Sequence, residues 1–250
     1  MTENKDITIL VVDDEPDLRE IISLEFEMLG WKTLMAENGR QAYDLIKTNK
    51  INVVISDIRM PGGDGVELVD RLREASFEVP VVLFISGFAD ITREEAYAKG
   101  VEAIFSKPFD RKVLVRTVKQ YLIPLQERWS KTPEKGPSPT EIQFQFESIE
   151  EAEKKDFFSM GRGGFFLHLD KNFPKQEDLV RFSFSFHQGI VKSLVGVGRV
   201  LWTRESVLDG LITGVGVEFL FIEALQSTGV LAYINTLKPK AFIPLGKIAA

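Results

Sequence analysis

Three aspartates lie where two strand-like segments end. Asp13 and Asp14 follow the β-branched residues 7–12, and Asp57 follows residues 52–56. If the first and third strands are neighbours in a parallel sheet, these carboxylates converge at one edge of that sheet. Their repulsion then requires a neutralising cation, and a set of oxygen ligands favours Mg²⁺. Such a site predicts transfer of a phosphoryl group to a carboxylate, because the metal offsets charge on the phosphoryl oxygens.

Two further side chains at strand ends fit the same chemistry. Ser86 ends a fourth strand-like segment and Lys107 a fifth, so a hydroxyl and an ammonium would both face a phosphoryl group. Lys107-Pro108 is a candidate cis-proline junction that would turn the lysine inward. Taken singly, Asp14 is an ordinary helix N-cap and Ser86 an ordinary turn residue. We favour one shared site over these separate roles, because the aspartates, Ser86 and Lys107 all fall at the carboxyl ends of their strands.

The elements that must position these residues alternate along the first half of the chain. Strand patterns occupy residues 7–12, 31–36, 52–56, 79–85 and 103–106, and helical patterns occupy residues 16–30, 39–48, 65–74, 92–99 and 110–123. This alternation predicts a doubly wound α/β domain with a five-stranded parallel sheet. Apolar residues of the last helix either pack on the sheet, which we favour, or form a dimer face. They are Val113, Leu114, Val118, Tyr121 and Leu122.

Four motifs within residues 5–123 resemble those of response-regulator receiver (CheY-like) domains of two-component signalling. They are VVDDEPDLR (11–19), ISDIRMPGGDG (55–65), LFISG (83–87) and IFSKPF (104–109). The resemblance implies a flavodoxin-like fold in which Asp57 accepts a phosphoryl group from a sensor histidine kinase or phosphotransfer protein. It also implies that Ser86 and Lys107 contact that group. Mg²⁺ would be held by Asp13, Asp14, Asp57 and the backbone carbonyl of Arg59.

The switch positions of that family correspond here to Ser86, Ile104 and Pro108. The family usually places Tyr or Phe three residues before the lysine, where this chain has Ile104. Phe105 is adjacent, but alternation along a strand points it to the other face. We therefore expect phosphorylation without aromatic switching at that position, and signal transmission through the helix at 92–99 and its flanking loops.

Composition separates the two halves of the 250-residue chain. The whole net charge of −6 falls on residues 1–130, and 13 of the 19 phenylalanines fall in residues 131–250. The absence of cysteine excludes a disulfide scaffold and thiolate metal sites. Without a basic face we expect no DNA binding, and without an apolar run of roughly 20 residues no membrane span. A cytoplasmic protein is expected.

The second half predicts a different architecture. We assign residues 1–125 to the receiver-like domain, 126–140 to a linker containing KTPEKGPSP, and 141–250 to an antiparallel β-barrel. Its strand candidates are residues 142–147, 165–169, 179–186, 190–203 and 214–221, followed by a closing helix at 223–237. Phe182, Phe184 and Phe186 have the period of two expected of a barrel core.

Three glycine-aromatic motifs in this half resemble a PilZ domain, a small β-barrel that is often a receptor for cyclic di-GMP. They are GRGGFF (161–166), GRVLW (198–202) and GVGVEF (214–219). The family binds the dinucleotide through Arg-x-x-x-Arg and Asp/Asn-x-Ser-x-x-Gly. No Arg-x-x-x-Arg occurs between Ser130 and Ser159, and the second motif is mostly lost. If cyclic di-GMP bound, Arg162, Gly163 and Gly164 would be the remaining candidate contacts. We expect instead a degenerate PilZ-like domain that does not bind the nucleotide.

Together these patterns predict a response regulator and not an enzyme. Its barrel would contact an unidentified downstream protein, and Mg²⁺ is the one cofactor expected. The alternative is a cyclic di-GMP effector whose receiver modulates nucleotide binding. A receiver-regulated enzyme is disfavoured because residues 140–250 show no catalytic triad, zinc motif or Walker-type loop.

Overall fold

The chain divides into two compact units. The computed structural model describes residues 6–74, 80–87, 91–131, 139–226, 228–237 and 241–246, so residues 132–138 of the predicted linker lie outside the described residues. The first unit comprises Met1–Thr92 and Lys99–Leu122, and the second comprises Arg93–Ala98 and Ile123–Ala250. Within the described residues, no helix has the length and apolarity needed to cross a membrane.

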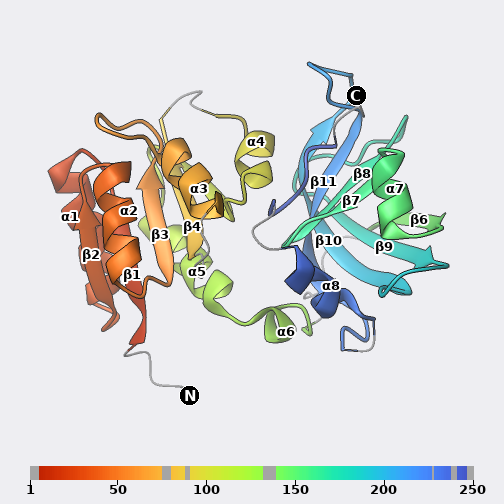
Figure 1. Cartoon of the computed structure of the whole chain (residues 1–250), viewed down its shortest axis with the longest axis horizontal. Helices are drawn as coiled ribbons and strands as arrows, with labels where there is room; N and C mark the ends of the chain where they lie inside the picture. Colours follow the sequence, from red (N-terminus) through yellow and green to blue (C-terminus); the bar gives the residue numbers. More distant parts are fainter. Residues whose placement is uncertain are drawn as a thin grey trace. The chain divides into compact units, whose positions relative to one another are not determined.

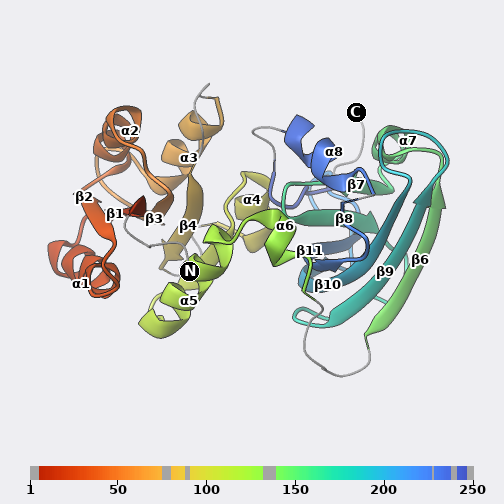
Figure 2. The same cartoon turned by 90° about the horizontal axis from the view of Figure 1, so that it is seen from below.

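The first unit is a parallel sheet with helices on both faces (Figure 1). Its strands, in the order β2-β1-β3-β4-β5, confirm the predicted five-stranded sheet and make β1 and β3 neighbours. They are β1 Thr8–Val12, β2 Lys32–Ala36, β3 Val53–Asp57, β4 Val81–Ser86 and β5 Ala103–Ser106. The helices are α1 Pro16–Glu27, α2 Gly39–Thr48, α3 Gly65–Glu74 and α5 Arg111–Leu122. Helices α1 and α5 contact each other on one face, and α2 and α3 contact each other on the opposite face (Figure 2).

Local sequence explains these elements. Strands β1 and β3 are buried along their whole length, which is why their apolar residues run without alternation. Pro16 stands at the start of α1, where its missing N–H costs nothing, and the Asn38 side chain caps α2 by accepting from the Gln41 amide. On α5, Leu114, Val118 and Tyr121 are buried, so this face packs within the unit as favoured from the sequence.

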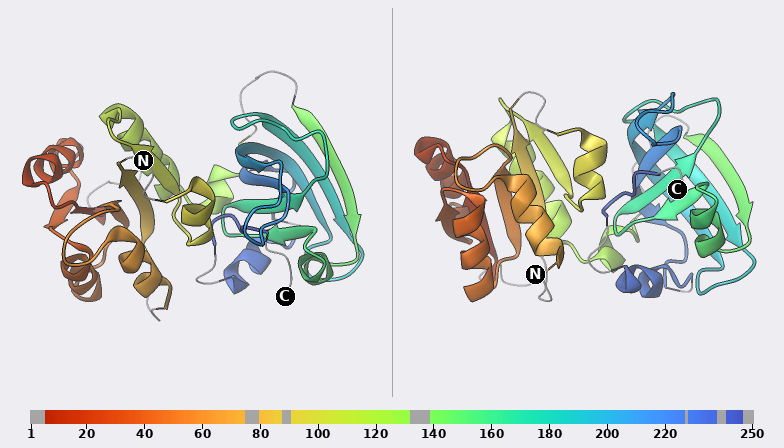
Figure 3. Two further views of the ribbon diagram at one scale, coloured as in Figure 1. Left: turned by 90° about the horizontal axis from the view of Figure 1, so that it is seen from above. Right: turned by 45° about the horizontal axis from the view of Figure 1, so that its top comes forward.

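The second unit is built around a curled six-stranded sheet (Figure 3). Its strand order is β6-β9-β10-β11-β8-β7. The strands are β6 Thr140–Phe146, β7 Phe158–Met160, β8 Gly164–His168, β9 Leu179–Phe186, β10 Ser193–Arg204 and β11 Gly214–Ile222. The helices are α4 Arg93–Ala98, α6 Leu125–Arg128, α7 Ile149–Lys154 and α8 Val230–Thr236.

Two details of this unit correct the sequence prediction. Four of the five pairings among the described strands are antiparallel, as predicted. However, β6 pairs with β9 in parallel, and the described strands form an open ladder from β6 to β7 in place of the predicted closed barrel. The closing helix is shorter than residues 223–237, because Gly229 adopts a left-handed conformation with φ of 76° and α8 begins after it. Alternation along β6 and β9 marked both as strands but carried no information about their relative direction.

Aromatic side chains fill the core of the second unit. Phe182, Phe184 and Phe186 are buried there, which confirms their prediction as core residues. Trp129, at the end of α6, belongs to the same core, with its ring 5.2 Å from that of Phe219 in an edge-on contact. The Trp129 carbonyl also accepts a hydrogen bond from the Ile222 amide at 2.9 Å. The residues just after α5 are therefore structural parts of the second unit.

Candidate functional site

The three aspartates singled out from the sequence meet at one edge of the first sheet. Because β1 and β3 are adjacent and parallel, with Val12 paired to Ser56, the next residues Asp13 and Asp57 lie side by side at the carboxyl ends of the two strands. One carboxylate oxygen each from Asp13, Asp14 and Asp57 lies within 4.8 Å of the others. Asp13 and Asp57 are buried and Asp14 is exposed. This set of oxygens suits a hard divalent cation such as Mg²⁺.

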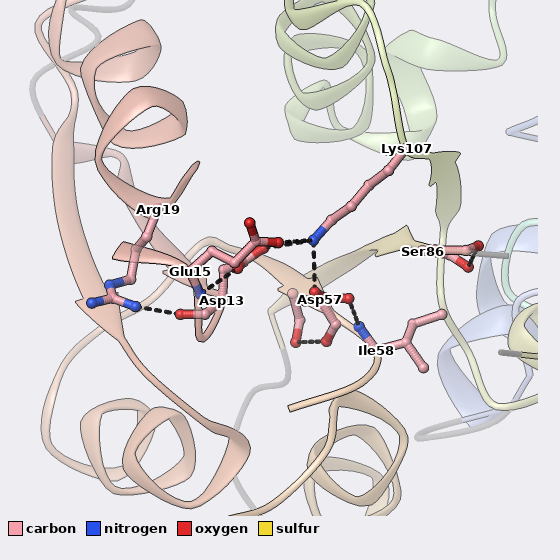
Figure 4. A network of polar contacts seen from close by, with 9 residues as sticks. Asp13, Glu15, Arg19, Asp57, Ile58, Ser86 and Lys107 are labelled. Atoms are coloured by element: carbon pink, nitrogen blue, oxygen red, sulfur yellow. Dashed lines mark hydrogen bonds and ion pairs between the residues drawn. The ribbon is translucent and has the colours of Figure 1, made fainter. Parts of the chain in front are cut away.

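Lys107, at the end of β5, extends into this cluster (Figure 4). Its Nζ lies 2.7 Å from Oδ2 of Asp57 and 3.2 Å from Oδ2 of Asp13. Burial alone would lower the pKa of Lys107, but the hydrogen bond to Asp57 and the negative charges of Asp13 and Asp57 outweigh it and raise that pKa. The lysine therefore stays protonated and bridges the two buried carboxylates. The Lys107-Pro108 peptide bond is cis, as expected from the sequence.

Backbone groups hold the two buried carboxylates in place. Oδ1 of Asp57 accepts from the Ile58 amide at 2.6 Å, and Oδ1 of Asp13 accepts from the Glu15 amide at 2.8 Å. Helix α3 begins close to this point because Gly65 has no side chain: a Cβ there would lie 2.4 Å from the Asp57 carbonyl oxygen. Each aspartate therefore has one oxygen fixed by the backbone and one facing Lys107.

Two contacts in this network were not predicted. The Arg19 guanidinium donates to the Asp13 carbonyl, and Glu15 Oε1 lies 3.4 Å from Lys107 Nζ. Glu15 and Arg19 lie within six residues of Asp13, so their closeness to the acidic cluster could have been predicted from the sequence. The sequence did not reveal that the lysine would reach a third carboxylate.

The predicted switch residues Ser86 and Ile104 make different contacts. Ser86 is buried, and its Oγ donates to the Gly87 carbonyl at 2.7 Å, pointing away from Asp57 (Figure 4). Phe105 packs in the core with α1 and α5, which confirms that alternation turns it to that face, while Ile104 lies opposite Phe84 of β4. Arg59 is exposed in the connection between β3 and α3.

The glycine turn of the second unit (residues 161–164) has backbone partners of its own. The amides of Arg162 and Gly163 donate at 3.0 Å to the carbonyls of Ala241 and Phe242 respectively. Gly164 begins β8, where a Cβ would lie 1.9 Å from the Val217 carbonyl oxygen. Both amides are thus already hydrogen-bonded to carbonyls of the 241–246 segment.

Replacing Asp13 by asparagine is expected to stabilise the protein in Mg²⁺-free buffer at neutral pH. Burial raises the pKa of Asp13 above its ordinary 3.8, although the Glu15 amide and the Lys107 charge act in the opposite direction. The folded state therefore holds this proton more tightly than the unfolded state, and ionised Asp13 lowers stability as pH rises from 3.8 through the raised pKa. Urea unfolding at several pH values should show the advantage of Asp13→Asn shrinking as pH falls. A less stable Asp13→Asn at neutral pH would contradict this sign.

Comparison with known proteins covers the first half of the chain. Residues 9–119 match the response regulator receiver domain. Sporulation initiation phosphotransferase F of Bacillus subtilis is 32% identical over 115 residues, which are 46% of this chain and 92% of that protein. The phosphate regulon transcriptional regulatory protein PhoB of Pseudomonas aeruginosa is 33% identical over 117 residues, 46% of this chain and 51% of that protein.

Larger relatives and solved structures match a similar share of the chain. The chain spans about half of the PhoB relative and 13% of the sensor histidine kinase RcsC of Escherichia coli, to which it is 30% identical. The receiver domain of NtrX from Brucella abortus is 31% identical, with a TM-score of 0.42, and the match covers 46% of this chain and 97% of that domain.

Proposed function

The chain belongs to the response regulator receiver family, and on that premise we propose that Asp57 accepts a phosphoryl group from a histidine kinase or phosphotransfer protein. The observation that supports this proposal is the set of groups around the Asp57 carboxylate. One of its oxygens accepts from the Ile58 amide and the other contacts the Lys107 ammonium. Asp13 and Asp14 lie beside it. Structural ion pairs also occur at strand ends, but they do not need three clustered carboxylates. A charged cluster of this kind is arranged for a highly charged substrate.

In the proposed reaction an oxygen of the Asp57 carboxylate attacks the phosphorus of the donor. A new P–O bond forms as the bond to the donor's leaving group breaks, and the donor departs with that electron pair. The Ile58 amide fixes Oδ1 of Asp57, so the carboxylate is oriented before the donor arrives. The Lys107 ammonium already contacts Oδ2 of Asp57. It is therefore placed to contact the negatively charged phosphoryl oxygens once the group is transferred to that carboxylate.

Asp13, Asp14, Asp57 and the Arg59 carbonyl would hold Mg²⁺, which supplies positive charge to the phosphoryl oxygens when bound. Ser86 would donate its hydroxyl to another of those oxygens, which requires it to leave the Gly87 carbonyl. The chain's own groups thus account for both the orientation of the nucleophile and two of the contacts to the phosphoryl group.

Labelling with radioactive acetyl phosphate and Mg²⁺ tests this proposal directly. We expect acid-stable, base-labile label on the wild-type protein and essentially none on Asp57→Asn, because an amide cannot form the acyl phosphate. Glu67→Gln, which alters an exposed carboxylate on α3, is the matched control and should be labelled like the wild type. Equal labelling of the wild type and Asp57→Asn would show that the phosphoryl acceptor is another residue.

For the second unit we propose a PilZ-like module that contacts a downstream protein and does not bind cyclic di-GMP. The curled sheet and its three glycine-aromatic motifs support the likeness. The missing Arg-x-x-x-Arg motif supports the lack of dinucleotide binding. Calorimetric titration with micromolar cyclic di-GMP should give no saturable heat. Clear saturable binding would favour the alternative, a cyclic di-GMP effector that the receiver modulates.

A further inference from the structure

A run of backbone hydrogen bonds links α4 to the glycine turn through the 241–246 segment. The Tyr97 carbonyl accepts from the Phe242 amide at 2.8 Å, and the Phe242 carbonyl accepts from the Gly163 amide at 3.0 Å. The Gly163 carbonyl accepts in turn from the Phe219 amide of β11 at 2.8 Å. Phe242 is therefore inserted between a helix and a turn that are far apart in the sequence.

The glycine turn is shaped for the Phe242 side chain. A Cβ on Gly163 would lie 1.8 Å from Cε2 of the Phe242 ring, and a Cβ on Gly161 would lie 2.3 Å from the Phe242 carbonyl oxygen. The Phe242 ring is 3% exposed and lies 6.0 Å from the ring of Tyr97, which is 5% exposed. We call the space left by Gly161 and Gly163 the aromatic notch.

An ionic contact holds the same segment to the same helix. Arg204 of β10 is buried, and its NH1 donates to the Leu245 carbonyl at 3.1 Å and to the Ile212 carbonyl at 2.6 Å. The other side of its guanidinium pairs with Glu94 of α4. Helix α4 and the 241–246 segment are thus joined twice, through Tyr97 and through the Glu94–Arg204 pair.

Helix α4 also connects the two strands that end at the acidic site. It follows β4, which ends at Ser86, and precedes β5, after which Lys107 enters the carboxylate cluster. A phosphoryl oxygen that takes the Ser86 hydroxyl breaks its bond to Gly87, the residue that leads towards α4. Ser86 is thus the residue of the site that lies nearest to α4 along the chain.

We propose that the aromatic notch is a docking site for an extended peptide segment bearing an aromatic side chain, and that this chain's own Phe242 occupies it until phosphoryl transfer to Asp57 loosens α4. The proposal rests on the proposed function of Asp57. Once Phe242 leaves, the notch and the Gly163 amide that bonded to the Phe242 carbonyl become available to a partner segment with the same chemistry. The notch now holds the Phe242 ring, and the Ala241 and Phe242 carbonyls accept hydrogen bonds beside it. We expect a partner segment to present the same groups, an aromatic ring and adjacent backbone carbonyls.

Hydrogen exchange on the full chain tests the release of Phe242. With acetyl phosphate and Mg²⁺, the amides of Arg162, Gly163 and Phe242 should exchange about tenfold faster than without the phosphodonor. Asp57→Asn should show no change. Intact mass on the same samples gives the phosphorylated fraction. A phosphorylated protein with unchanged or slower exchange at these amides would overturn the release of Phe242, whereas no phosphorylation at all would overturn the function proposed for Asp57.

Two variants test the notch independently of phosphorylation. Gly163→Ala places a methyl group inside the Phe242 ring position, so exchange at the Phe242 amide should be fast with or without phosphodonor. The double variant Gly163→Ala/Phe242→Ala removes that clash and should melt close to Phe242→Ala alone. A double variant as unstable as Gly163→Ala would mean that the glycine is needed for another reason.

A labelled peptide of sequence AFIPLG, which is residues 241–246, tests docking. It should bind Phe242→Ala and the phosphorylated wild type at least about tenfold more tightly than the untreated wild type. The peptide AAIPLG is the control and should bind none of them. Equal or absent binding of AFIPLG in all three proteins would overturn the docking site.

Discussion

Replacement of Lys107 by methionine is expected to lower the free energy of unfolding of the first unit by about 3 kcal/mol in Mg²⁺-free buffer, the lower end of the cost of breaking a buried ion pair. The lower end applies because the lysine side chain is 23% exposed while its partners Asp13 and Asp57 are 1% and 9% exposed. Methionine keeps the unbranched side chain as far as Cε and removes the ammonium, so the loss of stability measures the contribution of the charged group. Both aspartates would be left buried beside each other without it.

Mg²⁺ should restore much of this loss, because a divalent cation and the lysine neutralise the same carboxylates. Unfolding by urea, followed by circular dichroism with EDTA or with Mg²⁺, should show a larger Mg²⁺ stabilisation of Lys107→Met than of the wild type. Lys99→Met is the matched control, since Lys99 pairs with Asp70 at the surface and such pairs are worth about 0–1 kcal/mol. An equal Mg²⁺ effect on Lys107→Met and the wild type would show that the cation does not bind at this cluster.

Replacement of Trp129 by alanine is expected to destabilise the second unit by about 3–5 kcal/mol, the range for removing a large aromatic side chain from a core. Trp129 is 1% exposed, and its ring packs edge-on against Phe219. Alanine keeps the backbone hydrogen bond to Ile222, so the loss of stability measures the cost of the cavity left by the indole ring. The first unit does not contain this residue and should keep its own transition.

Far-UV and near-UV circular dichroism during urea unfolding would separate the two transitions, because a chain of two units does not unfold as one. Phe157→Ala is the control: it also removes an aromatic ring from the second unit, but Phe157 is 46% exposed. Its cost should stay within about 1 kcal/mol. Similar losses in Trp129→Ala and Phe157→Ala would place Trp129 outside the stabilising core.

The acidic cluster could be predicted because its chemistry depends on strand order alone. Asp13 follows β1 and Asp57 ends β3, two strands that are buried along their whole length, and parallel strands bring their ends to one edge of the sheet. The burial of the phenylalanines of β9 could be predicted in the same way, because aromatic residues at every second position of a strand lie on one face of the sheet. In both cases a local pattern determines where the side chain points.

Features that depend on distant partners could not be predicted in this way. Trp129 fell within the predicted linker at 126–140, and its burial depends on Phe219, which lies much further along the chain. The parallel pairing of β6 with β9 joins segments separated by α7, β7 and β8. The orientation of the Ser86 hydroxyl is set by the adjacent Gly87 carbonyl, and a serine at a strand end is compatible with either direction.

The position of α4 also bears on how the protein is made. A ribosome adds roughly 5–20 residues per second, and a domain can fold as soon as its contacts have emerged. Strands β1 to β5 complete their pairing early, but Glu94 and Tyr97 must wait for Arg204 and Phe242, which are synthesised much later. Helix α4 is therefore synthesised before these two partners. Its contacts with Arg204 and Phe242 form only after the second half of the chain has been translated.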